Sequence, residues 1–328
     1  MKNKIIEQIR SSIYEEIKLF NNNYYKIIQS KVNLMNNITH YIMKLKGKQI
    51  RPILIFLIAK MLGKITEKTY NTAYLIELIH IATLIHDDVV DNSHLRRGNL
   101  SINALWKNKI AVLVGDYIFS KSLKITINNN HIDLLKIVLK TIEQMSEGEL
   151  LEIEQSKNLN ILNITEKSYE EIILYKTASL ISASCEVGAY SIGANKHICA
   201  IFRKFGELVG LAFQMKDDLF DYENYNIGKP VGIDIQNKKI TLPLIYTLQK
   251  CNNKTQKWII DSIKNNKVDK NIIQEIIKIV RKHGGIDYTI NKMKILRKKS
   301  LKLLKNFPEN SSKKSLKLMV DYIISRKY

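Results

Sequence analysis

The chain has 328 residues, of which 45% are hydrophobic, so it can bury a large core. Its 52 Lys and Arg against 31 Asp and Glu residues give a formal net charge of +21, which suits an anionic partner such as nucleic acid, a membrane surface or a phosphorylated substrate. Lys, Asn and Ile are over-used everywhere, however, and a biased composition explains the charge without any selection for binding. The three cysteines form no C-x-x-C pair, which argues against a disulfide framework and fits a reducing cytoplasm.

Helix is the predicted structure almost everywhere, because only 4 Pro and 13 Gly interrupt long stretches rich in Ile, Leu, Lys and Glu. No Ser/Gly/Pro linker and no repeat divides the chain, so we expect one all-α domain over residues 1–328. Residues 71–90 are apolar on nearly all sides, which is typical of a helix buried in the middle of a fold. The expected helices cover residues 5–20, 24–45, 53–62, 71–90, 110–127, 134–154, 168–192, 200–222 and 243–248, with more in the C-terminal third.

Neither the N-terminal stretch nor the most apolar region of the chain indicates a membrane segment. The opening MKNKIIEQIR places charges among its apolar residues, as an amphipathic helix does and a signal peptide does not. The most apolar region, residues 73–85, is interrupted by Glu77 and His80 and is shorter than the about 20 residues that span a bilayer. We therefore expect a soluble, cytoplasmic protein.

The helix predicted at 71–90 leads into HDDVVD, residues 86–91. Asp87 and Asp91 stand four residues apart, so they share one helical face and can jointly hold a cation. Carboxylates at this end of an apolar helix face repulsion from the helix dipole as well as a cost of burial, so positive charge must compensate them. A single such motif is also compatible with a solvated acidic helix end.

A second copy strengthens the metal hypothesis, because QMKDDLFD at residues 214–221 repeats the pattern at the end of another apolar helix. Carboxylate oxygens without a His or Cys cluster suit Mg²⁺, which typically binds one or two carboxylates together with substrate phosphate. Near the first motif, LRRG at 95–98 offers two arginines that can fork to phosphate oxygens. KGKQIRP at 46–52 adds positive charge at a helix entrance, where backbone N–H groups also favour anions. These patterns together predict a diphosphate site.

The sequence resembles the trans-isoprenyl diphosphate synthases from about residue 46 through residue 243. The stretches that carry the resemblance are GKQIRP, ELIHIATLIHDDVVD, LRRG, VLVGDYIFS, EGELLE, YKTASL, AFQMKDDLFDY, GKPVGIDI and TLPL. It implies an all-α bundle of the isoprenoid synthase type with a central cavity. It also implies a Mg²⁺-dependent prenyltransferase that condenses isopentenyl diphosphate onto an allylic diphosphate such as farnesyl diphosphate.

The resemblance also implies roles for individual residues. The allylic diphosphate would be held through Mg²⁺ by Asp87 and Asp91, with Asp88 beside them, and touched by Arg96. Isopentenyl diphosphate would be bound by Lys48, Arg51, His80 and Arg97. The allylic side would further be lined by Lys176, Thr177, Gln214, Lys229 and Lys239, and metal binding completed by Asp217, with Asp218 and Asp221. The catalytic set would be Asp87, Asp91, Lys176 and Asp217.

Two of these residues have a plain structural alternative. His80 could be a satisfied core histidine, although it lies two helical turns before Asp87 on the same face. Lys176 could form a mere salt bridge within its apolar helix. The sequence also departs from the family where Lys46-Gly47-Lys48 replaces Gly-Gly-Lys, where Gly232-Ile233-Asp234 replaces Gly-Asp-Asp, and where Lys238 replaces a glycine. The departures on the second-motif side leave its metal geometry open.

Product length depends in this family on the positions four and five residues before the first aspartate, where bulky aromatics stop chain growth. Here these positions hold Thr83 and Ala82, which predicts an open tunnel and a long product. Overall resemblance to the bacterial octaprenyl members favours an octaprenyl product, used as a quinone side chain. Weak membrane contact for product release is then expected. The family commonly forms homodimers through helix faces, and the apolar stretch 105–127 is compatible with a homodimer, although a buried core helix explains that stretch equally well.

Four other functions remain open at this stage. A class I terpene cyclase usually carries an Asn/Ser/Glu motif in place of the second aspartate motif. A shorter-chain farnesyl or geranylgeranyl synthase is disfavoured by Ala82 and Thr83. A basic helical nucleic-acid-binding protein leaves the paired aspartate motifs unexplained, so no nucleic-acid partner is expected. A non-catalytic partner subunit usually loses one of the two motifs, and this chain keeps both.

Overall fold

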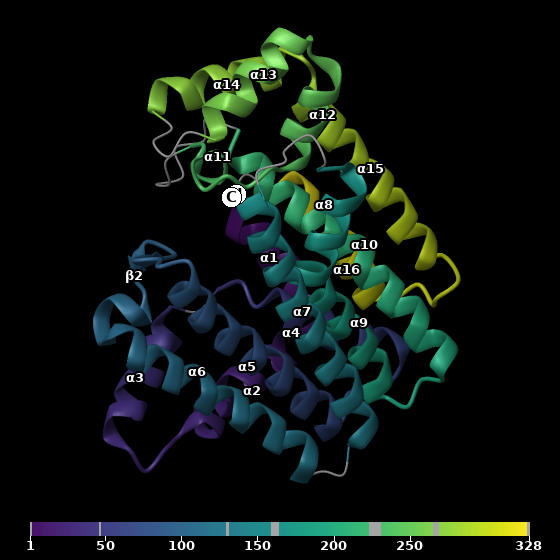
Figure 1. Ribbon diagram of the computed structural model, residues 1–328. Coiled ribbons are helices and arrows are strands. Elements are labelled where there is room, and N and C mark those ends of the chain that lie inside the picture. The colour runs from purple at the N-terminus through teal and green to yellow at the C-terminus, as the bar shows by residue number, and fades with distance from the viewer. Residues whose placement is uncertain are drawn as a thin grey trace. The chain divides into compact units, whose positions relative to one another are not determined.

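The computed structural model describes residues 2–45, 47–128, 131–158, 164–222, 231–264 and 269–326. Figure 1 shows that these residues form helices with one short hairpin, which confirms the all-α prediction. They fall into two compact units. Unit 1 comprises Met1–Lys140, Ala183–Arg203 and Asn306–Met319, and unit 2 comprises Thr141–Ser182, Lys204–Lys305 and Val320–Tyr328. The expectation of a single domain stays a prediction.

The elements follow one another with short connections. Unit 1 contains α1 (Lys2–Arg10), the 3₁₀ turn η1 (Ser11–Ile13), α2 (Tyr14–Ile28), α3 (Asn33–Lys44), α4 (Ile50–Leu62), α5 (Glu67–Val90), β1 (Leu95–Arg96), β2 (Asn99–Leu100) and α6 (Ile102–Asn128). Unit 2 contains α8 (Glu166–Ile173), the π-helical turn η3 (Leu174–Ala178), α11 (Ile233–Gln236), α12 (Leu242–Lys250), α13 (Asn253–Lys264), α14 (Lys270–Lys282) and α15 (Gly285–Leu303). Residues of α7 (Ile132–Asn158), α9 (Ser179–Ser191), α10 (Lys196–Phe220) and α16 (Ser311–Ser325) belong to both units.

The core of unit 1 is built around α5, which runs beside α4 and α6. Its side chains are buried on nearly every side from Thr72 to Ile79, as the all-round apolar sequence predicts. An aromatic cluster joins α5 to its neighbours, since the Phe20 and Tyr74 rings stack with centroids 4.8 Å apart. Burial on all sides fixes the direction of α5, and with it the place where the acidic motif emerges.

The N-terminal helices differ from the predicted ranges 5–20 and 24–45. The chain continues as helix α2 through Asn21 to Asn23 and breaks instead after Ile28. Phe20, Tyr24 and Ile28 recur at helical spacing and are all buried, so tertiary packing outweighs the low helix propensity of the asparagines. The actual break is closed by Asn36, whose amide side chain bonds both the N–H and the carbonyl of Ser30.

Two local irregularities were not predicted. The β1–β2 hairpin turns at Arg97 and Gly98, whose positive φ angles of 53° and 78° are typical of a tight two-residue hairpin turn. The helix expected at 168–192 is interrupted by the π turn η3, which contains Lys176. Gly148 on α7 touches this turn so closely that a Cβ there would lie 2.5 Å from the Lys176 backbone nitrogen. Both irregularities shape the candidate site.

In unit 2, two glycines let α10 approach the chain around η3. A Cβ at Gly206 would lie 2.5 Å from the Cα of Ser182, and one at Gly210 would lie 2.5 Å from the Cα of Ala178. This close approach sets Gln214, one turn beyond Gly210, opposite Thr177. In the part of the chain that the structure describes, no helix is long and apolar enough to cross a membrane.

We predict that Gly210→Ala destabilises the protein, because the new methyl group meets backbone atoms that cannot move aside. Overpacking costs about 1–3 kcal/mol, and the higher helix propensity of alanine returns up to about 1 kcal/mol. The urea midpoint should therefore fall. Gly63→Ala is the matched control, since its Cβ would meet nothing nearer than 3.9 Å. Equal midpoints for the two variants would contradict the close approach.

Candidate active site

The first aspartate motif lies at the C-terminal end of α5, where its three carboxylates occupy different environments. Asp88 is 3% exposed, Asp87 is half-buried, and Asp91 is exposed just beyond the last helical residue. The Asp91 N–H donates to the Asp87 carbonyl at 2.8 Å, so the helical spacing of these two residues is kept. The pair predicted to share a face therefore does so at the solvent side of the helix end.

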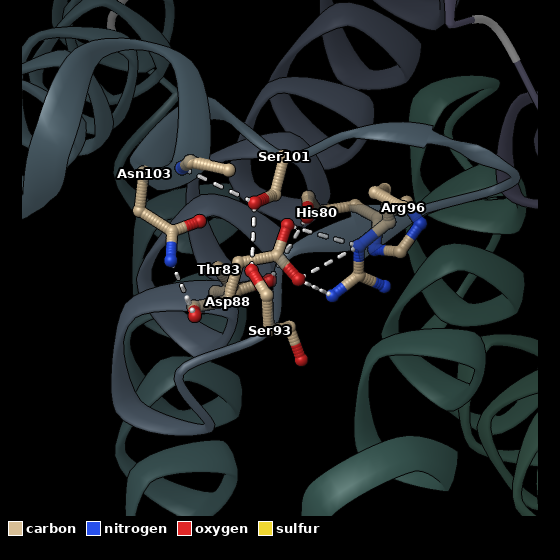
Figure 2. Close-up of polar contacts among 8 residues, drawn as sticks. His80, Thr83, Asp88, Ser93, Arg96, Ser101 and Asn103 are labelled. Carbon is tan, nitrogen blue, oxygen red and sulfur yellow. Dashed lines mark hydrogen bonds and ion pairs between the residues drawn. The ribbon is translucent and has the colours of Figure 1, made fainter.

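The buried Asp88 is neutralised by Arg96, which the hairpin brings back over the helix end (Figure 2). The Arg96 Nε donates to both Asp88 carboxylate oxygens at 3.0 Å, and Nη2 also donates to Oδ1. Asn103 of α6 donates to the Asp88 carbonyl, which ties α6 to the end of α5, and the Ser101 hydroxyl donates to the Ser93 carbonyl, which joins the two ends of the hairpin segment. Asp88 and Arg96 thus form a buried pair that holds the motif in place.

Arg97 points to the loop before α4. Its Nη1 donates to the Leu45 carbonyl at 2.7 Å, and its guanidinium lies against Gly47, where a Cβ would come within 2.4 Å of it.

Burial lowers the pKa of Arg51 to about 10, although the negative charge of Glu77 raises it in part. Burial, with the charges of Arg51 and Arg97, lowers the pKa of His80 well below its ordinary value. His80 is therefore a neutral imidazole beside cationic neighbours.

A pocket of about 70 Å³ lies among these residues in unit 1. Its polar lining includes Gln49, Glu77, His80, Arg96 and Arg97. Its apolar wall includes Ile42, Met43, Ile81, Leu84 and Ile85. A pocket lined by both arginines and aliphatic side chains suits a small molecule with an anionic head and an apolar tail.

In unit 2, Lys176 is held between two carboxylates of α7. Its Nζ lies 2.6 Å from Glu149 Oε2 and 2.7 Å from Glu152 Oε2, and Lys239 Nζ lies 3.0 Å from the same Glu152 oxygen. Burial alone would lower the pKa of Lys176, but the two glutamates raise it above its ordinary value. The salt bridge considered from the sequence is therefore present, and it keeps Lys176 charged.

The second motif forms a chain of hydrogen bonds at the end of α10. Thr177 donates to Gln214 at 2.7 Å, and Gln214 donates to Asp218 Oδ1 at 2.8 Å. Tyr169 donates to the other Asp218 oxygen, and burial raises the pKa of Asp218 to about 7. These bonds bring together two of the residues predicted for the allylic side with one of the predicted metal ligands.

The outer aspartates of this motif are also engaged. Asp221 accepts the backbone N–H groups of Gly232, Ile233 and Asp234, so it caps the short helix α11 even though Ile233 replaces the usual acid. Asp217 pairs with Arg326 at 2.8 Å. Lys238 adopts φ 60°, the left-handed conformation that explains why a glycine is usual there. The predicted Lys229 lies outside the described residues.

The donor set fits a hard divalent cation, because both motifs offer only carboxylate oxygens. Among the described residues, no three His, Cys, Asp or Glu side chains gather closely enough to form a complete metal cage. Magnesium sites that include substrate phosphate need only one or two carboxylates, and the half-buried Asp87 with the exposed Asp91 is a pair of that kind.

The chain matches the polyprenyl synthetase profile over residues 32–280. It belongs to the polyprenyl synthetase family. It is 30% identical to octaprenyl diphosphate synthase of Haemophilus influenzae, with 98% of each chain covered, and 30% identical to a short chain isoprenyl diphosphate synthase of Methanothermobacter thermautotrophicus, with 86% and 87% covered. A polyprenyl synthase from Caulobacter crescentus, crystallised with calcium and isoprenyl diphosphate, superposes with a TM-score of 0.91 at 28% identity over 98% of each chain.

Membership confirms the resemblance, the all-helical fold and the prenyltransferase class, and it makes isoprenoid diphosphates the substrates. Sequence reasoning about this polyprenyl synthetase missed four residues of the site: Glu149, Glu152, Tyr169 and Arg326. Both glutamates lie in the EGELLE stretch, which carries the family resemblance, but the sequence assigned no role to them. The sequence offered no signal for Tyr169 or Arg326, which reach their partners only through the fold.

We predict that Glu152→Gln lowers the stability of the protein by about 2 kcal/mol at neutral pH, because two lysines lose their shared carboxylate. Burial would raise the pKa of Glu152, but Lys176 and Lys239 outweigh it and lower that pKa below 4.5. The ion pairs of Glu152 therefore stabilise the protein fully above the pKa that Glu152 has in the unfolded chain. This stabilisation is lost as pH falls through the lower pKa that Glu152 has in the folded protein. Denaturation of both proteins at several pH values checks this. Glu154→Gln, an exposed change on the same helix, is the control, and a gap that persisted at low pH would contradict the ion-pair explanation.

Proposed function

We propose that this protein is a long-chain trans-polyprenyl diphosphate synthase that adds isopentenyl diphosphate units to an allylic diphosphate such as farnesyl diphosphate, with an octaprenyl product. The observation that carries the proposal is the end of α5. There Asp88, paired with Arg96, lines a small pocket together with Arg97, a neutral His80 and several aliphatic side chains. In a member of the polyprenyl synthetase family, this arrangement suits recognition of an isoprenoid diphosphate.

Isopentenyl diphosphate is assigned to the cationic residues of this pocket. Arg97 and His80 line it, and the loop and first turn that carry Lys48 and Arg51 adjoin it. A neutral His80 can donate a hydrogen bond to a phosphate oxygen while adding no repulsion between the neighbouring arginines. Its low pKa thus favours a binding role over that of a proton donor.

The allylic diphosphate is assigned to the aspartate motifs with Mg²⁺. At the first motif Asp87 and Asp91 would be the ligands, and at the second motif Asp217 would be the main one. Asp88 and Asp221 would act mostly as supports, because Arg96 and the α11 backbone already engage them. The metal would supply charge that stabilises the departing pyrophosphate. That the Caulobacter relative was crystallised with calcium and isoprenyl diphosphate supports a hard cation here.

The reaction needs no protein nucleophile. The allylic C–O bond breaks, and pyrophosphate leaves with the electron pair, which cationic side chains near the aspartate motifs would stabilise; Arg96 is proposed for this role at the first motif, and Lys176 and Lys239 at the second. The double bond of isopentenyl diphosphate then attacks the allylic cation. A proton is lost from the adjoining carbon to pyrophosphate, which restores an allylic diphosphate one isoprene unit longer. Thr177 and Gln214 would orient the allylic group.

Product length is assigned to Ala82 and Thr83. Ala82 is fully buried, and the Thr83 hydroxyl bonds back to the His80 carbonyl, which leaves its methyl group as the only apolar projection. Small side chains one turn before the acidic pair favour a long product, destined for a quinone. The short-chain relative, equally similar at 30% identity, makes a shorter-chain synthase the second candidate.

Assembly and location complete the proposal. The exposed apolar side chains of α6 support a homodimer through this helix; they are Leu105, Val112, Leu113 and Ile127. A cytoplasmic enzyme with weak membrane contact would suit an apolar product that must reach a bilayer.

The deciding experiment incubates the purified protein with Mg²⁺, farnesyl diphosphate and labelled isopentenyl diphosphate, and reads chain length by chromatography after dephosphorylation. We expect octaprenyl products that disappear when EDTA removes the metal. Farnesyl or geranylgeranyl products alone would keep the enzyme class and establish the short-chain candidate. A folded, magnesium-loaded sample without incorporation would contradict the synthase function.

We predict that Ala82→Tyr shortens the products, because an aromatic ring one turn before Asp87 would close the tunnel. Ala82→Gly adds no bulk and should leave the product length unchanged. Thermal melting of both variants shows whether they fold. If a folded Ala82→Tyr enzyme still makes products of wild-type length, residue 82 does not line the tunnel.

A further inference from the structure

The family profile begins at residue 32, yet three side chains from before it reach the candidate active site. Arg10, the last residue of α1, donates from Nη2 to the Lys48 carbonyl at 2.8 Å. Asn21 on α2 accepts a hydrogen bond of 2.9 Å from Gln49 Nε2. Tyr24, also on α2, is 1% exposed and lines the same pocket as Gln49. The N-terminal helices therefore form part of the wall and support of this site.

The loop that they contact needs external support. Gln49 adopts φ 51° and ψ 43°, a left-handed conformation that costs a residue with a Cβ about 1–2 kcal/mol. Such a conformation persists where the surroundings determine it. Directly after it, α4 begins at Ile50 and presents Arg51 from its first turn. A shift of the loop would move Lys48 and Arg51 together.

Arg10 is built into the structure rather than lying on its surface. Its side chain is partly buried, and its Nε is buried without a hydrogen-bond partner among the described residues. Burial also lowers the pKa of this guanidinium. The charged Arg10 side chain is partly desolvated, and it donates a hydrogen bond to the Lys48 carbonyl. This bond favours the one position of the carbonyl in which it can form. Arg97 in turn donates to the Leu45 carbonyl, so arginine side chains hold the backbone at Leu45 and at Lys48.

We propose that Arg10 is a positioning residue for isopentenyl diphosphate, which it serves by fixing the backbone of Lys48 and, through it, the start of α4. The inference rests on the proposed function and adds to it a residue outside the family profile. Arg10 itself binds the protein backbone and does not touch the substrate. Loss of the Arg10 side chain should therefore weaken the binding of isopentenyl diphosphate and leave the rate of the chemical step unchanged.

The test compares the full-length wild-type protein with Arg10→Met, Arg10→Lys and Lys4→Met. We expect Arg10→Met to raise the KM for isopentenyl diphosphate about tenfold, equivalent to about 1.4 kcal/mol, with kcat and the KM for farnesyl diphosphate changed less than about twofold. Arg10→Lys should recover part of the affinity, since an ammonium group can also donate to the carbonyl. Lys4→Met removes an exposed cation from the same helix and should match wild type.

An unchanged KM for isopentenyl diphosphate in Arg10→Met would overturn the inference. So would parallel losses for both substrates together with a lower melting temperature, because these indicate a purely structural role. Calorimetric titration with isopentenyl diphosphate gives the same comparison without turnover. If wild type binds isopentenyl diphosphate but turns over no allylic primer, the proposed function fails. The effect of Arg10→Met on binding still decides the role of Arg10.

Discussion

The buried pair of Asp88 and Arg96 is the interaction on which the candidate site residues of unit 1 depend. A carboxylate that is 3% exposed at the negative end of an apolar helix is stable only with a cation beside it. Arg96 reaches it because the chain reverses in a two-residue turn, and the same turn directs Arg97 to the loop before α4. One neutralised charge therefore fixes the helix end, the hairpin and the loop.

The candidate site residues of unit 2 follow the same principle with opposite signs. In unit 2 the buried cation is Lys176, and acids from α7 compensate it, with Glu152 shared between Lys176 and Lys239. Gly148 allows α7 close enough for these ion pairs to form. The cations proposed to meet a leaving pyrophosphate are thus held charged and in place before substrate arrives, which lowers the cost of reorganisation during reaction.

Family membership and physical detail answer different questions about this protein. The profile match establishes a polyprenyl synthetase and its class of substrates. Relatives with octaprenyl and short-chain products are equally similar, so overall likeness does not choose a product length. That choice is argued from two side chains on α5, where Ala82 and Thr83 add little bulk near the acidic end. The N-terminal helices, outside the profile, contribute contacts that likeness would not reveal.

The sequence by itself determined the all-α class, the buried character of α5, the two aspartate motifs and the two adjacent arginines, because helical periodicity and charge spacing are local properties. It misplaced the break between α2 and α3, since burial of Tyr24 and Ile28 overrides a run of asparagines. It indicated neither the π turn at Lys176 nor the partners Glu152 and Arg326. Only the tertiary structure decided that Asp88 is buried against Arg96 while Asp91 is exposed, because neighbours in the sequence enter different environments when the chain turns back over a helix end.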